Sequence, residues 1–188
     1  MTTYKIASGR ELRIAISGKS GCGNTTVSKL LAEGLGIKLI NFTFRQLAAE
    51  KGISLAQVME NAKTDDSYDI EIDTRQLELA RKESCVLASR LAIWMLKEAD
   101  LKIYLIASPD ERVKRILKRE GGEFEEVKSF TLMRDSQDSA RYLRLYKIDN
   151  DDYEFADLKI DTLKYAPDRI VDIILKELLK RGLVEREG

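Results

Sequence analysis

The sequence predicts an α/β protein in which helices cover both faces of a parallel sheet. Short apolar segments rich in β-branched residues, such as 12–18 and 101–108, have the length and composition of buried strands. Segments with the periodicity of amphipathic helices separate these strands along the chain. Strands that alternate with helices pair in parallel, and ligands of such sheets bind beyond the carboxyl ends of the strands.

Helix stop and capping residues divide the first half of the chain into elements. Val27, Leu31 and Leu35 recur at helical spacing before Gly36, which ends a helix, and Ser54 is positioned to cap another one. The expected order is a strand at 12–18, a helix at 25–35, a strand at 37–41, helices at 44–52, 55–63 and 68–83, and a strand at 85–89.

The second half of the chain continues this alternation. Ser108 and Glu111 form a capping box with Pro109 in the first turn, which predicts a helix that runs to Gly121 and Gly122. The expected order is a helix at 90–99, a strand at 101–108, helices at 109–121 and 123–146, a strand at 156–162 and a closing helix at 167–181. With no internal repeat or low-complexity linker, 188 residues fit one domain.

The composition excludes several classes of function. The chain has 32 basic and 32 acidic residues and no histidine. A net charge of zero disfavours a nucleic-acid-binding surface, and the lack of histidine excludes Ser-His-Asp catalysis and histidine-bound metals. No apolar run approaches the ~20 residues of a membrane span, and the first residues lack the apolar middle of a secretion signal. Cys22 and Cys85 are far apart and form no metal-type spacing, so a reducing cytoplasm is the expected location. From the charge and the hydropathy we expect that the protein binds neither nucleic acid nor membranes.

The stretch GKSGCGNTT follows a predicted strand and opens a predicted helix. It matches the phosphate-loop pattern G-x-x-x-x-G-K-[ST] except where the pattern has lysine. Backbone amides and the helix N-terminus then bind phosphate, and the hydroxyl of Thr25 is expected to bind Mg²⁺. An ordinary glycine-rich turn is the alternative, which the strand-to-helix context disfavours. The expected phosphate-binding residues are Gly18, Lys19, Ser20, Gly21, Cys22, Gly23, Asn24, Thr25 and Thr26.

Asn24 stands at the position of the missing lysine. Charge-assisted hydrogen bonds contribute about 1.5–3 kcal/mol and neutral ones about 1 kcal/mol. Removing a donor aimed at developing charge costs about 3–4 kcal/mol in the barrier, so an uncompensated site is expected to bind nucleotide and turn it over slowly. Lys19 enters the loop from its other end on a flexible stem. Our hypothesis is that its ammonium partly replaces the missing cation; the alternative is a solvated lysine.

Besides the loop, the segments IDTRQLELA, SRLAIWMLKEADLKIYLIA, RVKRILKREG and RYLRLYKIDNDD carry a family resemblance over nearly the whole chain. Together they resemble the short, archaeal-type cytidylate kinases, a branch of the P-loop nucleoside-monophosphate kinases. The resemblance implies a three-layer α/β/α P-loop NTPase fold with a parallel sheet, a helical NMP-binding arm and a helical lid. It places the core at about 11–41, 84–121 and 147–188, the arm at about 42–83 and the lid at about 121–146.

The family resemblance implies Mg²⁺-dependent transfer of a phosphoryl group from ATP to CMP or dCMP, in a monomer or weak dimer. On this pattern Arg45 and Arg90 look like the clamp on the acceptor's phosphate, and Asp73, Arg75 and Gln76 look like part of the acceptor pocket. Independently, a carboxylate accepts from the exocyclic amino group of cytosine, and a guanidinium satisfies ring acceptors. Each arginine taken singly is a surface side chain; their joint placement favours the site.

The expected lid helix carries arginines at helical spacing. Arg134 and Arg141 share one face, and on a closing helix such cations neutralise charge on the transferring phosphoryl group. The alternative is an exposed, salt-bridged face. Arg112, Arg115 and Arg119 form a second stripe, for which we expect that exposed face, except at Arg115.

Departures from the family pattern leave the function open. Where the family has Glu-Gly before the arginine and a glycine near the tryptophan, this chain has Ala88, Ser89 and Ile93. The missing carboxylate removes an outer ligand of Mg²⁺, and the bulkier side chains are expected to narrow the acceptor pocket. The favoured function is CMP or dCMP kinase. The alternatives are a weakened nucleotide-binding module that senses or binds partners, and a kinase for a different small acceptor.

Overall fold

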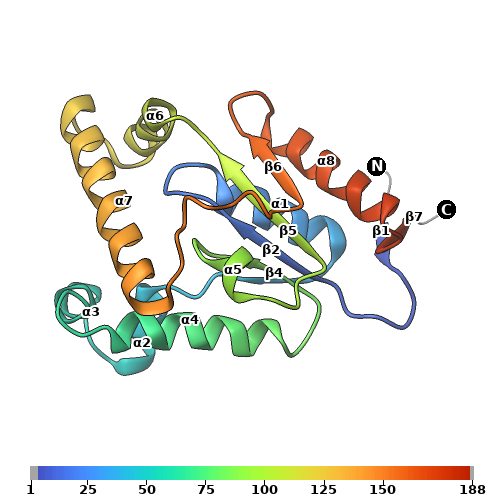
Figure 1. The fold of residues 1–188 in the computed structure, drawn as a ribbon, viewed down its shortest axis with the longest axis horizontal. Coiled ribbons are helices and arrows are strands. Elements are labelled where there is room, and N and C mark those ends of the chain that lie inside the picture. The colour runs from blue at the N-terminus through green and yellow to red at the C-terminus, as the bar shows by residue number, and fades with distance from the viewer. Residues whose placement is uncertain (1–3, 187–188) are drawn as a thin grey trace.

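A parallel five-stranded sheet of order β3-β4-β2-β5-β6 forms the centre of the molecule (Figure 1). The structure is a computed structural model that describes residues 4–186. In the sheet, Ile14 of the central strand is in register with Val86 on one side and Leu101 on the other. The strands are β2 (Arg13–Ser17), β3 (Lys38–Ile40), β4 (Cys85–Ala88), β5 (Leu101–Ile106) and β6 (Leu158–Asp161).

Helices follow the strands in the expected order. They are α1 (Asn24–Leu35), α2 (Phe44–Lys51), α3 (Leu55–Asn61), α4 (Ser67–Ala80), α5 (Ala92–Met95), α6 (Pro109–Glu120), α7 (Phe124–Tyr146) and α8 (Pro167–Lys180). Two of the predicted caps are confirmed, because Ser54 accepts a hydrogen bond from the Gln57 amide and Ser108 accepts one from the Glu111 amide.

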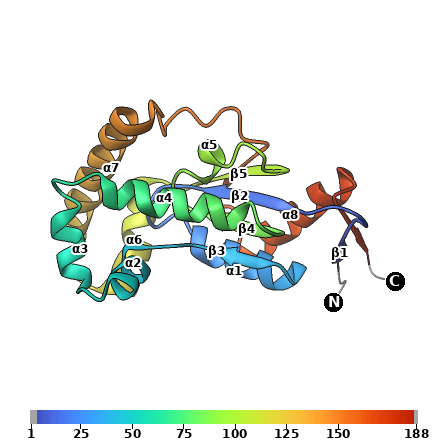
Figure 2. The same ribbon diagram turned by 90° about the horizontal axis from the view of Figure 1, so that it is seen from below.

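Successive residues of the strands point into two different cores. Ile14 and Ile16 of β2 pack with α1 and α8, whereas Ala15 between them packs with α4 and α5. Figure 2 shows α5 on one side of the strands and α1 on the other. Helices therefore cover both faces of the parallel sheet, and the predicted three-layer α/β/α fold is confirmed.

The arm and lid segments lie together at one end of the molecule. In both views α2, α3 and α7 gather at the end opposite to the chain termini (Figures 1 and 2). A third core cluster, with Phe42, Leu47, Val58 and Ile72, holds α2, α3 and α4 to one another. The helix α7 packs against α6 and reaches the start of α4 through an ion pair between Arg144 and Asp66. No helix within residues 4–186 combines the length and apolar character that a membrane crossing needs.

Two predicted helices are shorter in the structure, and one pair of strands was not predicted. The helix expected at 90–99 is the single turn α5, because the chain turns into the core at the fully buried Leu96. The helix expected at 68–83 ends at Ala80. A two-stranded antiparallel ribbon, β1 (Tyr4–Ile6) with β7 (Val184–Arg186), was not predicted, because each strand has only three residues and its partner lies at the far end of the sequence.

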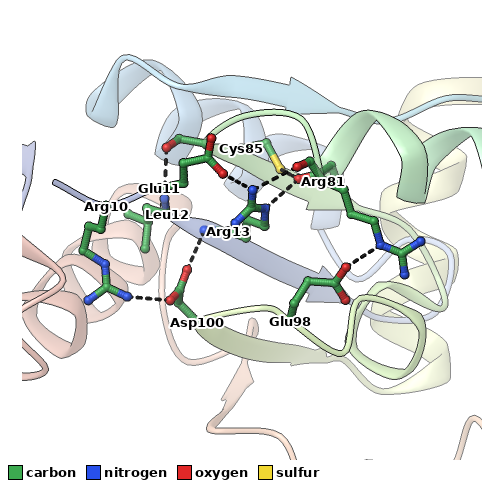
Figure 3. Close-up of polar contacts among 10 residues, drawn as sticks. Arg10, Glu11, Leu12, Arg13, Arg81, Cys85, Glu98 and Asp100 are labelled. Carbon is green, nitrogen blue, oxygen red and sulfur yellow. Dashed lines mark hydrogen bonds and ion pairs between the residues drawn. The ribbon is translucent and has the colours of Figure 1, made fainter.

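Polar contacts close the edge of the sheet where the strands begin (Figure 3). Arg13 Nε donates to the Ala80 carbonyl (2.9 Å) and Arg13 Nη2 to the Arg81 carbonyl (3.0 Å), which explains the early end of α4. Asp100 accepts from the Arg13 amide (2.8 Å) and from Arg10 Nη2 (2.6 Å). These groups satisfy one another within the fold, so their role is structural, at the opposite edge from the phosphate loop.

Candidate functional site

The loop between β2 and α1 has the conformation that its glycines require. Gly21 and Gly23 adopt φ values of +82° and +95°, where a side chain is strained. A Cβ on Gly18 would lie 2.7 Å from the Leu105 carbonyl, so that position also needs glycine. The loop ends at the first turn of α1, beyond the carboxyl end of β2. The expected strand–loop–helix context of a phosphate site is therefore present.

Asn24 uses its side chain inside the fold. Its Nδ2 donates to the Ile16 carbonyl (3.1 Å), and its Oδ1 accepts from the hydroxyl of the buried Ser28 (2.9 Å). The Asn24 amide thus joins the start of α1 to the end of β2, and it supplies no charge to the loop. The hydroxyl-bearing residues Thr25 and Thr26 that follow are exposed in the first turn of α1.

Lys19 forms an ion pair with Asp151, at 2.6 Å between Nζ and Oδ1. Asp151 belongs to the segment that connects α7 with β6. An aromatic stack holds that segment to the sheet, because Tyr153 lies parallel to Tyr104 of β5 with ring centroids 3.9 Å apart. In this structure the ammonium of Lys19 therefore binds a carboxylate of a neighbouring segment, which is the partner that a nucleotide phosphate would have to replace.

The expectation for the α6 stripe was wrong at Arg112. This side chain is only 3% exposed; its Nη1 donates to the Ser20 carbonyl (3.0 Å), and its guanidinium binds Asp135 of α7. Arg115 also contacts the loop, donating to the Cys22 carbonyl (3.3 Å). Arg119 fits the expected exposed face and pairs with Glu120. The sequence did contain a signal for this contact. The helix α6 follows β5 at the same edge of the sheet as the phosphate loop, so its first residues could have been expected to lie near the loop.

A cavity of about 350 Å³ lies beside the loop, between the start of α1 and the segment that joins β6 to α8. Arg115 spans it, with Nη1 donating to the Thr162 hydroxyl (2.7 Å) and Nη2 to the Thr162 carbonyl (2.9 Å). Apolar side chains complete its lining, including the exposed Leu163 and Tyr165. The sequence analysis did not predict that the segment after β6 lines this cavity. The expected carboxyl end of β6 was a signal for it, because ligands bind beyond the carboxyl ends of parallel strands.

On the other side of the loop, arginines from two elements meet around acidic side chains. Arg90 follows β4, and it forms an ion pair with Asp138 of α7. Asp138 also accepts from Arg141 Nη2 (2.8 Å), and Arg141 Nε lies 3.3 Å from Asp69 Oδ1 of α4. A small pocket that includes Gly18, Lys19, Arg90 and Asp138 connects this network with the phosphate loop.

Arg134 lies on α7 near these cations. The residue is exposed, and no ion pair of Arg134 occurs among residues 4–186. Its part in the lid stays a prediction. The acidic partners of Arg90 and Arg141 were not foreseen.

The α4 residues of the expected acceptor pocket lie deeper. Asp73 accepts a hydrogen bond from the Tyr146 hydroxyl (2.8 Å), and burial raises the pKa of Asp73 to about 6 against the lowering effect of that hydrogen bond. Gln76 is 4% exposed, and its Oε1 has no hydrogen-bond partner in the described part of the chain. The Oδ2 of Asp69 is likewise buried and unpartnered. Buried acceptors without donors are costly, so this face of α4 is suited to a ligand that donates hydrogen bonds.

Two other predicted acceptor residues remain apart from this group. Arg75 is exposed and lies 3.6 Å from Glu50 of α2, and Arg45 is exposed on α2. Neither Arg45 nor Arg75 is among the residues that line the small pocket with Gly18, Lys19 and Arg90. Their assignment to the acceptor's phosphate stays a prediction.

Of the expectations for Ala88, Ser89 and Ile93, the structure contradicts the one for Ile93. Ile93 is fully buried among core residues of the α5 face, and its amide donates to the Ser17 hydroxyl (3.1 Å). Its side chain therefore fills the core and does not narrow the acceptor pocket. Ser89 continues the sheet, with its amide donating to the Ile16 carbonyl (3.3 Å). Ala88 is buried and provides no oxygen ligand at the end of β4.

Metal binding at this edge depends on few protein groups. Residues 4–186 contain no cluster of three or more acidic, cysteine or histidine side chains arranged to hold a metal ion. The hydroxyl of Thr25, exposed in the first turn of α1, is an oxygen donor at the end of the loop. Such a donor set fits Mg²⁺, which keeps most of its waters and binds largely through substrate phosphates.

Comparisons with known proteins agree with this geometry. The sequence model of the cytidylate kinase-like family matches residues 13–164. The chain is 46% identical over 176 residues to cytidylate kinase 2 of Borreliella burgdorferi, covering 92% of this chain and 98% of that protein. It is 41% identical to the cytidylate kinase of Archaeoglobus fulgidus, covering 88% and 93%.

The solved structures support the fold. A shikimate kinase from Acinetobacter baumannii in complex with shikimate superposes with a TM-score of 0.62, at 21% identity, over 92% of this chain and 96% of that one. At this identity the similarity concerns the fold alone, a P-loop kinase architecture. The match of the family model over most of the sequence, together with relatives above 40% identity, leads to one conclusion: the chain belongs to the cytidylate kinase-like family.

Proposed function

We propose that this protein transfers the γ-phosphoryl group of ATP to CMP or dCMP, forming ADP and the corresponding nucleoside diphosphate. Membership in the cytidylate kinase-like family supports the reaction class. The observation that carries the proposal is the position of Arg90 and Arg141, which approach one carboxylate in a pocket that adjoins the phosphate loop. A phosphate group would bind the same two guanidinium groups.

The donor nucleotide is assigned to the loop and the cavity beside it. Amides of Gly21 to Thr25 and the N-terminus of α1 would hold the β- and γ-phosphates. The 350 Å³ cavity, with Arg115 on one side and Tyr165 on the other, has the size and apolar lining to hold the base. Mg²⁺, held by Thr25 and the phosphates, would neutralise charge on the triphosphate.

The acceptor is assigned to the opposite side of the loop. Arg90 and Arg141 would bind its phosphate, and Asp138 and Asp69 occupy these guanidinium groups until it arrives. Asp73 and Gln76 offer acceptor oxygens to the exocyclic amino group of cytosine. Uracil presents a carbonyl at that position, so the same oxygens would disfavour UMP.

The transfer needs no covalent enzyme intermediate and no general base, because the acceptor's phosphate is already anionic. An oxygen of that phosphate bonds to the γ-phosphorus in line with the leaving group, and the bond from the γ-phosphorus to the β–γ bridging oxygen breaks, releasing ADP. Arg134 would stabilise negative charge on the transferring group, with Lys19 as a second cation if it leaves Asp151. The helix α7, lying over the reacting groups, would exclude water.

A steady-state assay of ADP formation tests this function. We expect turnover with MgATP that depends on CMP or dCMP and exceeds that with UMP or AMP. Arg169→Ala, at an exposed position of α8 that contacts neither pocket, serves as the control and should match the wild type. The absence of turnover with CMP and dCMP would contradict the proposal, and faster turnover with UMP or AMP would assign a different acceptor.

A second candidate function is a nucleotide-binding module with little catalysis. It is favoured by one observation, that Asn24 and Lys19 both have partners within the fold, so that neither directs a free cation at the phosphates. Titration calorimetry with MgATP separates the candidates. Tight ATP binding without turnover on any nucleoside monophosphate would support the module.

A further inference from the structure

Arg112 joins the phosphate loop to α7 through a buried contact. Its Nη1 donates to the Ser20 carbonyl of the loop (3.0 Å), and both terminal nitrogens bind the carboxylate of Asp135. The Arg112 side chain is 3% exposed and that of Asp135 is 14% exposed. Since removal of one partner from a buried pair leaves an unpaired charge, this contact strongly favours a single position of α7.

The loop side of this connection is rigid. A Cβ on Gly21 would lie 2.8 Å from the Arg112 carbonyl and 3.0 Å from the Arg112 Cβ, so the first turn of α6 packs directly on the loop. Ser108 and Pro109 fix the start of that helix. The backbone position of Arg112 relative to the phosphates is therefore set by packing, and only its side chain contacts α7.

The lid side of the connection contains a residue assigned to the reaction. Arg134 is adjacent in sequence to Asp135 on α7, and it is exposed without an ion pair in the described region. Asp135 also lines the small pocket that Lys19, Arg90 and Asp138 share. Because Arg134 and Asp135 are neighbours on one rigid helix, fixing Asp135 on the loop also fixes where the backbone of Arg134 lies relative to the loop.

Another ion pair between the same two helices provides a comparison. Lys128 of α7 lies 2.7 Å from Asp110 of α6, but these side chains are 32% and 57% exposed. Exposed pairs contribute about 0–1 kcal/mol. This pair joins the two helices without contacting the phosphate loop. A variant that breaks it is therefore a control, because it weakens α6–α7 packing and leaves the contact through Arg112 intact.

We propose that Arg112 and Asp135 are positioning residues for phosphoryl transfer: their ion pair sets α7 on the phosphate loop and so places Arg134 at the reacting phosphates. The inference rests on the proposed kinase function. In this proposal Arg112 and Asp135 act on the reaction through Arg134 and not by binding the transferred group. A misplacement of about 1 Å in a catalytic group can lower a rate on the order of 100-fold, which is the scale of the effect expected here.

A double-mutant cycle tests this role. We expect Asp135→Asn, which keeps one acceptor oxygen for Arg112, to lower kcat on the order of 10-fold to 100-fold with the Kd for ATP unchanged. Arg134→Ala should lower kcat much less in the Asp135→Asn background than in the wild type, because the positioned group is already lost. Lys128→Gln should keep the wild-type kcat. Additive losses from Asp135→Asn and Arg134→Ala would overturn the inference. If Asp135→Asn does not fold, the same kinetic cycle is measured with Arg112→Lys, for which we expect the same loss of kcat and the same lack of additivity with Arg134→Ala.

Hydrogen exchange gives a readout that needs no turnover. Asp135→Asn should speed amide exchange in the middle of α7 more than Lys128→Gln does, while exchange in β2 and β5 stays slow. Equal exchange in the two variants would overturn the inference. A wild-type protein without CMP-dependent turnover would contradict the kinase function instead, and the exchange data would then decide the positioning role on their own.

Discussion

Arg90 and Asp138 form an ion pair that joins the end of β4 to the middle of α7, and Asp138 binds Arg141 at the same time. The side chain of Asp138 is 8% exposed, so two cations share one nearly buried carboxylate. A dianionic phosphate offers more charge and more oxygens than a carboxylate does, and it would compete for both guanidinium groups. In the proposed function, Asp138 would thus balance the charge of Arg90 and Arg141 until the acceptor binds.

Arg90→Ala should raise the KM for CMP about 10-fold to 100-fold, because hydrogen bonds to charged groups contribute about 1.5–3 kcal/mol. The KM for ATP should change little, since the loop and the base cavity lie on the other side. Initial-rate kinetics with each nucleotide varied in turn measure both values. Equal effects on the two KM values would mean that Arg90 supports the fold and not the acceptor.

Asp73→Asn should stabilise the protein at neutral pH. Burial raises the pKa of Asp73 to about 6, above its unfolded value near 4, so the folded state favours the protonated form. The stabilising contribution of this group is present at low pH and is lost as the pH rises from about 4 through about 6. At pH 7.5 we expect Asp73→Asn to raise the unfolding free energy by up to about 3 kcal/mol, and the melting temperature should rise with it. Near pH 4 the substitution should have little effect on either quantity.

The same group should control the pH dependence of CMP binding. In the proposed function, the ionised Asp73 carboxylate is a stronger acceptor for the cytosine amino group than its protonated form, so the KM for CMP should rise as the pH falls through about 6. Asp73→Asn should remove this dependence and raise the KM at neutral pH. A wild-type KM for CMP that stays constant from pH 5 to 7.5 would exclude Asp73 from the base site.

Lys19→Ala should lower kcat on the order of 100-fold if its ammonium reaches the transferring phosphoryl group, given the cost of about 3–4 kcal/mol for a lost donor. Asp151→Asn, which frees Lys19 from its partner, should leave kcat unchanged or higher. Its effect on the melting temperature should be small, because the pair is exposed. A kcat of Lys19→Ala equal to that of the wild type would restrict Lys19 to its contact with Asp151.

Asn24→Lys should raise kcat and lower stability together. The variant supplies the cation of the common phosphate-loop pattern, but it loses the bonds to the Ile16 carbonyl and the Ser28 hydroxyl. The unmet groups should cost about 1–3 kcal/mol of unfolding free energy. Denaturant unfolding and steady-state kinetics measure the two effects. If kcat stays at the parent value, the missing lysine does not limit the rate.

Local signals in the sequence were sufficient for most of the architecture. The apolar run before Gly18 and the capping residues Ser54 and Ser108 predicted elements that the structure contains, because strands and helix starts depend mainly on neighbouring residues. The stretch GKSGCGNTT predicted a loop between strand and helix, and the structure has this loop, in which Gly21 and Gly23 adopt positive φ. Family membership, first seen as a resemblance of motifs, is confirmed by the comparisons.

Features that depend on distant residues were missed. The burial of Arg112 arises from Ser20 and Asp135, which lie far from it in the sequence, and helical periodicity alone suggested an exposed face. The base cavity is formed by α1 and the segment after β6, so no single motif indicates it. The partners of Lys19 and Asn24 likewise depend on the folded arrangement, because an ammonium or an amide binds whatever acceptor lies nearest.

The most direct measurement is a crystal structure with a bisubstrate analogue in which a phosphate chain links adenosine to cytidine. The account predicts donor phosphates on the amides of residues 21–25, the adenine beside Arg115, and the acceptor-side phosphate on Arg90 and Arg141 with Asp138 displaced. A phosphate loop without bound phosphate, or an acceptor-side phosphate that contacts neither Arg90 nor Arg141, would contradict it.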